Sequence, residues 1–345
     1  MELTDNLNIK QFKPLIAPNV LKDELSANDQ ITELVARSRK AVQDILTNKD
    51  QRRMVIVGPC SLHDCQATLE YAEKLRVLQQ QVKDKVLIIM RTYFEKPRTT
   101  LGWKGMIYDP HLDNSYDIEG GLRQSRSLLL SIASAGLPAA IEFLDPIVPQ
   151  YLADLVSWAA IGARTTESQI HRQMASGLSM PVGFKNCTDG NIASAIDAIK
   201  AASSAHSFMG IDRNGQAVIA ETSGNKYGHL VMRGGADCPN YGSEYVAFAE
   251  VLLHKAGIST GAIIDCSHAN SKKDYKKQRV AFLDVAEQIR QGNKLIAGVM
   301  LESFLNEGNQ SFTKPKDLKY GVSLTDSCIG WDETEELIYH LSEIK

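Results

Sequence analysis

Short apolar runs recur along the chain and alternate with segments of helical spacing. Within residues 67–75, for example, Leu69, Ala72 and Leu75 fall at intervals that place them on one face of a helix. Runs rich in Val, Ile and Ala predict buried strands at 54–60, 86–91, 139–144, 158–163, 181–184, 229–233, 261–265 and 295–301. Eight strand and helix units in succession favour a (β/α)8 TIM barrel, in which reacting groups sit where strands end.

A doubly wound open sheet is the alternative to the barrel. Neither of the glycine-rich nucleotide-binding fingerprints that would support it is present, so we favour the barrel. At 345 residues the chain is longer than a plain barrel requires. We expect residues 1–50 to form an N-terminal regulatory or oligomerisation extension and 51–345 the catalytic barrel. A β-hairpin is expected near 205–228, where two alternating runs meet at Asn214-Gly215.

Four potential metal ligands follow apolar runs. Cys60 follows the run from Met54, His268 follows the run that ends at Asp265, and Glu302 follows 298–301; Asp326 follows 321–325, which we also interpret as a strand. One thiolate, one imidazole and two carboxylates form a mixed soft and hard ligand set that suits a divalent transition metal. Each residue alone is more often structural, but the shared position favours a metal site.

Basic residues also stand at strand ends, although the chain is slightly acidic overall. Arg91, Arg164, Lys185 and Arg233 each follow an apolar run, and would converge on one rim of a parallel barrel. Several cations in one cleft require an anionic ligand such as a phosphate with a carboxylate. The segment 96–100, Lys-Pro-Arg-Thr-Thr, would suit a second phosphate.

Composition excludes several other classes of protein. A net charge of −3 without extended basic runs argues against nucleic acid or an anionic membrane as the main partner. No apolar stretch is long enough for a membrane span, and the start does not resemble a signal peptide. The six cysteines show no paired framework, so we expect a cytoplasmic, reduced protein. Four of them are expected to be packing residues, namely Cys65, Cys187, Cys238 and Cys266.

Several long motifs, in order, resemble one known family. They are Gly58-Pro59-Cys60-Ser61, the segment 91–100, Gly102-Trp103-Lys104-Gly105, the segment 161–168, the segment 181–186, Asp265-Cys266-Ser267-His268-Ala269-Asn270 and Glu302-Ser303. From Arg53 to Trp331 the chain is similar to the type I 3-deoxy-D-arabino-heptulosonate 7-phosphate synthases, the first enzymes of the shikimate pathway.

This resemblance implies a transferase that condenses phosphoenolpyruvate with erythrose 4-phosphate and releases phosphate. One divalent ion, Mn, Fe, Co or Zn, would be bound by Cys60, His268, Glu302 and Asp326. Phosphoenolpyruvate would be held by Arg91, Lys96, Ala163, Arg164, Lys185 and Arg233, with Glu142 near its reacting end. Erythrose 4-phosphate would contact Pro97, Arg98 and Thr99. Lys96 and Lys185 are both candidates for proton transfer, with Arg91 and Glu142 as further catalytic groups.

The resemblance also implies feedback inhibition by an aromatic amino acid in a homodimer or homotetramer. The effector pocket would be lined by Asn6, Pro149, Gln150, Leu178, Ser179, Phe208 and Gly210, with the N-terminal segment coming from a neighbouring subunit. Phenylalanine-regulated members carry a serine at the position of Gly210 and an aspartate at that of Asn6. The space at Gly210 and the neutral amide of Asn6 therefore favour tyrosine as the effector.

Two other functions remain open from the sequence. A related barrel condenses phosphoenolpyruvate with a five-carbon sugar phosphate, as in 3-deoxy-octulosonate 8-phosphate synthase, and segment 96–100 argues against it. A barrel without catalysis could instead serve as an amino-acid-binding regulatory subunit, and the intact ligand set argues against that. A further expectation is that Cys328, two residues after Asp326, can be oxidised together with Cys60 when the metal is absent.

Overall fold

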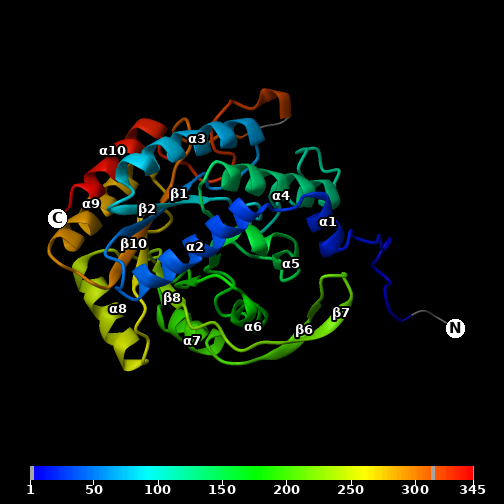
Figure 1. Ribbon diagram of the computed structural model, residues 1–345, viewed down its shortest axis with the longest axis horizontal. Coiled ribbons are helices and arrows are strands. Elements are labelled where there is room, and N and C mark those ends of the chain that lie inside the picture. The colour runs from blue at the N-terminus through cyan, green and yellow to red at the C-terminus, as the bar shows by residue number, and fades with distance from the viewer. Residues whose placement is uncertain (1–3, 312–314, 345) are drawn as a thin grey trace.

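The protein, described at residues 4–311 and 315–344 by a computed structural model, is built on a closed barrel of parallel strands (Figure 1). The barrel strands are β1 (Arg53–Gly58), β2 (Val86–Arg91), β3 (Ala139–Glu142), β4 (Val156–Ile161), β5 (Val182–Lys185), β8 (Gly228–Met232), β9 (Ala262–Asp265) and β10 (Ile296–Glu302). Their order around the barrel is β1-β10-β9-β8-β5-β4-β3-β2. The predicted (β/α)8 barrel is confirmed, and each of the eight apolar runs forms a strand. β4 begins and ends two residues earlier than the run 158–163 suggested.

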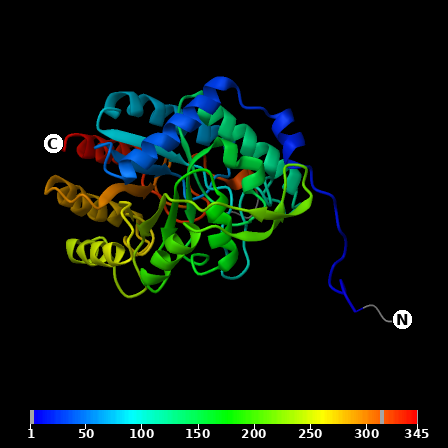
Figure 2. The same cartoon turned by 60° about the horizontal axis from the view of Figure 1, so that its bottom comes forward.

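Helices cover the outside of the barrel (Figures 1 and 2). They are α1 (Pro18–Glu24), α2 (Asp29–Leu46), α3 (Cys65–Val82), α4 (Ile118–Ser134), α5 (Pro149–Leu152), α6 (Gln169–Gly177), α7 (Ala193–Ala202), α8 (Ser243–Lys255), α9 (Gln278–Arg290) and α10 (Trp331–Ser342), with short 3-10 turns at Ala153–Leu155, Tyr275–Lys277 and Pro315–Asp317. Side chains of Asn28 and Asp64 accept hydrogen bonds from the first turns of α2 and α3, which explains where these helices begin. No helix of the described residues has both the length and the apolar character to cross a membrane.

The helix predicted over 67–75 is present as part of α3, but its buried face differs from the prediction. Leu69 is 40% exposed, whereas Ala72 and Leu75 are buried. The buried side of α3 also carries Tyr71 and Leu78, so the i, i+3, i+4 spacing runs through Tyr71 instead of Leu69.

The α2 helix closes the amino-terminal end of the barrel. Its residues Val42, Ile45 and Leu46 pack in one cluster with inward-facing strand residues such as Ile56 and Trp158. The backbone carbonyl of Leu46 also accepts a hydrogen bond of 2.8 Å from the amide of Gly261, just before β9. Helix α2 therefore closes the barrel at the amino-terminal ends of the strands, and the open end is at their carboxyl ends.

The predicted hairpin is confirmed as β6 (Ser207–Ile211) paired with β7 (Ala217–Glu221) in antiparallel register. Gly215 has φ +76°, a left-handed conformation that suits glycine in this turn. The turn contacts the start of α1, where the amide of Asn19 donates to the carbonyl of Arg213 at 2.8 Å. Most of the hairpin remains outside the barrel, with Met209 at 92% and Ile219 at 75% exposure.

Candidate active site

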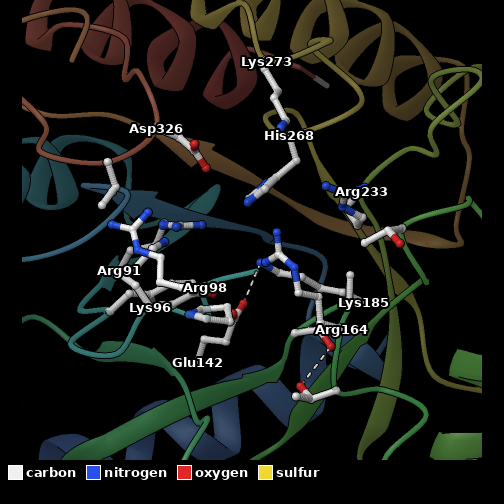
Figure 3. A pocket seen from close by; sticks show the side chains of 17 residues that line it. Arg91, Lys96, Arg98, Glu142, Arg164, Lys185, Arg233, His268, Lys273 and Asp326 are labelled. Atoms are coloured by element: carbon white, nitrogen blue, oxygen red, sulfur yellow. Dashed lines mark hydrogen bonds and ion pairs between the residues drawn. The ribbon is translucent and has the colours of Figure 1, made fainter. Parts of the chain in front are cut away.

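A cavity of about 150 Å³ opens at the carboxyl ends of the barrel strands (Figure 3). Its wall contains these residues that the sequence analysis selected: Arg91, Lys96, Pro97, Arg98, Glu142, Ala163, Arg164, Lys185, Arg233, His268 and Asp326. Thr99 lies in the wall of an adjoining cavity instead. Cations outnumber carboxylates around this space, so it favours a ligand with several negative charges.

Arg91 ends β2 and is fully buried at the bottom of the site. Its guanidinium donates to Oε1 of Glu302 at 2.9 Å, and it lies 4.0 Å from the centre of the Tyr93 ring. Burial alone would lower the pKa of Arg91, but Tyr93 and Glu302 raise it overall. The same arginine and His268 keep the pKa of Glu302 low despite its burial. Both groups are therefore charged, and the arginine holds the carboxylate in place.

Lys185 connects two buried carboxylates. Its Nζ lies 2.7 Å from Oε2 of Glu142 and 3.9 Å from Oδ2 of Asp265. Burial would raise the pKa of Glu142, but Lys185 and Lys96 lower it overall, so the carboxylate is ionised. The position of Glu142 also depends on Gly162, where an added Cβ would lie 2.8 Å from Oε1 of Glu142.

Three of the four predicted metal ligands come together. One potential ligand atom from each of Cys60, Glu302 and Asp326 lies within 4.8 Å of the others. His268 stands beside them, with Nε2 at 3.7 Å from Oε1 of Glu302. Its Nδ1 lies 2.8 Å from Oδ2 of Asp265, an arrangement that fixes the ring and leaves Nε2 facing the cluster.

Cys60 is buried in this cluster. Burial and the nearby Glu302 raise the pKa of its thiol to about 11, although Lys96 acts in the opposite direction. The Lys96 ammonium donates to both the carbonyl oxygen and Sγ of Cys60 at 3.1 Å. A cation bound at the cluster would favour loss of the thiol proton.

Asp326 reaches the site differently from the prediction. Segment 321–325 does not form a strand; it belongs to the long connection between β10 and α10. Isolated bridges hold this connection together, including one between Gly308 and Cys328. The Ser323 hydroxyl donates to the Asp326 carbonyl at 2.7 Å. The apolar run was too short to distinguish a strand from a loop braced by such bridges.

Several residues of the site were not selected from the sequence. Asp265 orients His268, Ser267 donates to Oε2 of Glu302 at 2.7 Å, and Tyr93 lines the cavity. Asp265 lies three residues before His268 in the same motif, and that spacing could have indicated its role. Lys273 also lines the cavity, but its sequence neighbourhood is a polar loop without a comparable signal.

The cysteines expected to be packing residues differ in burial. Cys187 and Cys266 are buried and Cys65 is half-buried, as expected. Cys238 is exposed, so its assignment as a packing residue is wrong. It lies on the loop after β8, where its Sγ is 3.3 Å from the hydroxyl of Tyr245.

The seven residues predicted to bind an effector lie far from the metal ligands in sequence and fall on four segments. Pro149 and Gln150 begin α5, Leu178 and Ser179 follow α6, and Phe208 and Gly210 belong to β6. Asn6 lies on the N-terminal arm, residues 4–15, in which every residue is exposed and which extends away from the barrel (Figures 1 and 2).

The sequence and the fold match one family of enzymes. Residues 27–338 match the model of the DAHP synthetase I family. The chain is similar to the Phe-sensitive phospho-2-dehydro-3-deoxyheptonate aldolase of Escherichia coli K12, with 53% identity over 98% of this chain and 96% of the relative. The Tyr-sensitive enzyme of the same strain is 49% identical over 98% of this chain and 95% of its own length.

Two further comparisons agree with these matches. The Trp-sensitive enzyme of E. coli K12 is 48% identical over 99% of this chain and 98% of the relative. The solved structure of phospho-2-dehydro-3-deoxyheptonate aldolase from Francisella tularensis SCHU S4 superposes with a TM-score of 0.96, at 49% identity over 98% of both chains. Relatives of all three named sensitivities are thus about equally similar, and overall identity does not select an effector.

Proposed function

Because the chain belongs to the DAHP synthetase I family, that of the type I DAHP synthases, we propose that it condenses phosphoenolpyruvate with erythrose 4-phosphate. The products are 3-deoxy-D-arabino-heptulosonate 7-phosphate and inorganic phosphate. The observation that carries the proposal is one cavity in which cations from β2, β5 and the loops after β4 and β8 surround a carboxylate, directly beside a cluster of metal-ligand residues.

Phosphoenolpyruvate is assigned to the cation-rich part of this cavity. Its carboxylate and phosphate match the charges contributed by a set of residues in the wall: Arg91, Lys96, Arg164, Lys185 and Arg233, with Ala163 beside them. Glu142, held by Lys185 at 2.7 Å, lies in the same wall and is placed near the reacting carbon. Holding both ends of the substrate fixes the exposed face of its double bond for attack.

Erythrose 4-phosphate is assigned to the segment after β2. Pro97 and Arg98 line the substrate cavity, and Thr99 lies in the adjoining one. The Arg98 Nε donates to the carbonyl of Trp103 at 2.8 Å, which braces the segment and leaves the other guanidinium nitrogens for a phosphate.

The residues beside the cavity fit one divalent ion such as Mn, Fe, Co or Zn. The donor set has one thiol and two carboxylates that lie together, with the His268 imidazole beside them. The carboxylate of Asp265 lies 2.8 Å from Nδ1 of that ring, so Nε2 is the nitrogen that faces the cluster. Bound there, the ion would polarise the aldehyde of erythrose 4-phosphate. Cys60, His268, Glu302 and Asp326 would hold it.

The surrounding side chains are assigned the remaining work of the reaction. The arginines keep phosphoenolpyruvate in place. They also stabilise the phosphate group, which leaves after water has added to the carbon that carries it. Lys185 is the better placed of the two lysines to pass a proton, because its Nζ contacts the ionised Glu142 in the cavity wall. Lys96 is engaged with Sγ and the carbonyl of Cys60 and is assigned to position that ligand.

A direct assay tests this activity. Product formation from phosphoenolpyruvate should be measured with erythrose 4-phosphate and, separately, with arabinose 5-phosphate, each with and without a chelator. We expect turnover with the four-carbon aldose alone and its loss on chelation. Preference for the five-carbon aldose would support the sister condensation, and binding without turnover would support a regulatory barrel.

The Cys60→Ala variant tests the metal assignment separately. It should keep the native circular dichroism spectrum, fail to retain the ion by elemental analysis and lose nearly all turnover. Cys65→Ala is the matched control, because Cys65 is half-buried on α3 and contacts Gln124 instead of the cluster. Full activity of metal-free Cys60→Ala would contradict the assignment.

The N-terminal arm is assigned to assembly and feedback control. It carries four exposed apolar side chains, Leu7, Ile9, Phe12 and Leu15, each at least 42% exposed. The hairpin likewise exposes Met209 and Ile219. Apolar groups of this size are usually covered, and a second copy of the chain in a homodimer or homotetramer would bring the arm to another subunit's hairpin.

The effector pocket is assigned to the junction of these parts, with Asn6 contributed by a neighbouring subunit. Removing residues 1–15 should abolish inhibition by an aromatic amino acid and leave turnover intact. Analytical ultracentrifugation of the same variant should show a smaller assembly. Unchanged inhibition in the truncated enzyme would contradict this assignment.

Tyrosine is the effector that we favour. Gly210 leaves space on β6, because the atoms nearest to an added Cβ, in Phe208 and Ala220, would be 3.8 Å away, an ordinary van der Waals distance. A serine therefore fits there without a clash and would fill the space assigned to the hydroxyl of tyrosine. Gly210→Ser should weaken inhibition by tyrosine relative to phenylalanine by about 1–3 kcal/mol. Stronger inhibition of the native enzyme by phenylalanine than by tyrosine would contradict this interpretation.

A further inference from the structure

A second cavity of about 690 Å³ adjoins the substrate cavity, between the loops that follow β8 and β9. Arg164, Thr188, Arg233 and Lys273 line both spaces, so the two are neighbours across a shared wall. We call the second space the vestibule. Its size is within the range of small-molecule sites and is larger than a single phosphate requires.

The vestibule is strongly positive. Arg164, Arg233, Lys272 and Lys273 contribute four cations to its wall, against the single carboxylate of Asp237. Among the described residues, neither lysine takes part in an ion pair, whereas Lys277 on the same segment pairs with Asp274 at 3.5 Å. The charges of the two lysines therefore remain available to an anion that enters from solvent.

The backbone fixes the place of both lysines. Lys272 and Lys273 have φ of 53° and 61°, and His268 has φ of 54°, although none of them is glycine. Such left-handed residues carry a conformational cost and are retained where the surroundings determine them. The amide of Lys273 donates to the carbonyl of His268 at 2.8 Å, which ties the vestibule wall to the catalytic rim. Figure 3 shows the side chains of both residues at the edge of the substrate cavity.

We propose that the vestibule is a transient binding site and exit path for the inorganic phosphate released in the reaction. This inference rests on the proposed function. In that reaction water adds to the phosphate-bearing carbon, and the bond from that carbon to the phosphate oxygen then breaks. The electron pair and a proton leave with the phosphate, and the oxygen from water remains as the ketone. Because Arg164 and Arg233 face both spaces, the phosphate can stay close to these two cations while it moves into the vestibule. Lys272 and Lys273 then bind it there.

The competing occupant is the phosphate of erythrose 4-phosphate, because Thr99 also lies in the vestibule wall. The two cases differ in what the lysines affect. If the vestibule receives the product, removing the lysine charges should weaken the binding of inorganic phosphate to enzyme that already holds phosphoenolpyruvate. If it receives the substrate, the same change should raise the KM of erythrose 4-phosphate.

The test is calorimetric titration of inorganic phosphate into metal-loaded enzyme saturated with phosphoenolpyruvate. Native enzyme should bind one phosphate under these conditions. The double variant Lys272→Asn and Lys273→Asn keeps residues that tolerate the left-handed backbone but removes both charges, and should bind phosphate about tenfold more weakly. The matched control is Lys276→Asn with Lys277→Asn, which removes two cations from the same segment outside the vestibule wall and should change affinity by less than about twofold.

Steady-state inhibition supplies the second measurement. Added phosphate should inhibit native enzyme in a way that saturating phosphoenolpyruvate does not fully overcome. The double variant Lys272→Asn and Lys273→Asn should lose the part of the inhibition that remains at saturating phosphoenolpyruvate. Equal phosphate affinity in the two double variants, or phosphate binding only after phosphoenolpyruvate is removed, would overturn the proposal. So would a raised KM for erythrose 4-phosphate with unchanged phosphate binding. Phosphate binding by a protein that shows no turnover would instead count against the proposed function.

Discussion

The pair formed by Trp158 and His229 inside the barrel should make stability depend on pH. The indole Nε1 of Trp158 donates to Nε2 of His229 at 2.9 Å, and Nδ1 of His229 lies 3.0 Å from the carbonyl of Tyr227. Nδ1 therefore carries the proton, and Nε2 must remain unprotonated to accept from the indole. Burial lowers the pKa of His229 to about 4.

The sign and size of the effect follow from this shift. The folded state holds His229 neutral, whereas an unfolded chain would protonate it below its ordinary value of 6.5. Its contribution to stability is thus fully present above pH 6.5 and is lost as the pH falls toward 4. A shift of this size corresponds to about 3 kcal/mol in total, of which about 2 kcal/mol is lost by pH 5.

Urea unfolding at pH 7.5 and at pH 5 measures this loss. His229→Gln can still accept from the indole but does not titrate, so its stability should fall by about 2 kcal/mol less than that of the native chain over the same interval. His254→Gln, which changes an exposed histidine on α8, should behave like the native chain. Equal losses in His229→Gln and native protein would refute the reasoning.

Three further changes have expected outcomes. Gly183→Ala would place its Cβ 2.6 Å from the ring of Trp158, and thermal unfolding should reveal a loss of about 1–3 kcal/mol. Glu302→Gln removes the charge opposite a buried arginine; about 3–5 kcal/mol of stability and metal retention should both be lost, and native-like melting would contradict this. Air oxidation of chelator-treated enzyme should join Cys60 to Cys328, since both thiols are buried and Cys60 lies close enough to Cys328 to act, after burial and Glu302, among the causes that raise the pKa of Cys328. Peptide mapping that finds only unlinked thiols would dispose of the idea.

The barrel could be predicted because each of its strands is buried on both faces. Runs such as 86–91 and 295–301 contain almost only apolar residues, and eight of them that alternate with helical segments leave few alternative folds. The same logic placed the cations, since the carboxyl ends of parallel strands must share one rim. Arg91 and Lys185, which end β2 and β5, are direct consequences of that rule.

Residues that reach the site through loops could not be placed in the same way. Asp326 comes from a long connection held by isolated bridges. Lys273 comes from a polar loop in which its backbone is left-handed, and the sequence of this loop has no apolar pattern that would predict its position. The exposure of Cys238 likewise depends on the course of the loop after β8. Leu69 shows a related limit, because three apolar residues can share a helical face without that face meeting the barrel.

The helix that closes the barrel from below has a consequence for how each molecule is made. The ribosome synthesises α2 before any of the strands. Val42, Ile45 and Leu46 therefore emerge from the ribosome before the strand residues against which they pack have been made. Among those partners is Met300, which is synthesised near the end of the chain. The ligand cluster similarly joins an early residue, Cys60, to a late one, Asp326. A growing chain can therefore have neither a closed barrel before Met300 is made nor a complete ligand cluster before Asp326 is made.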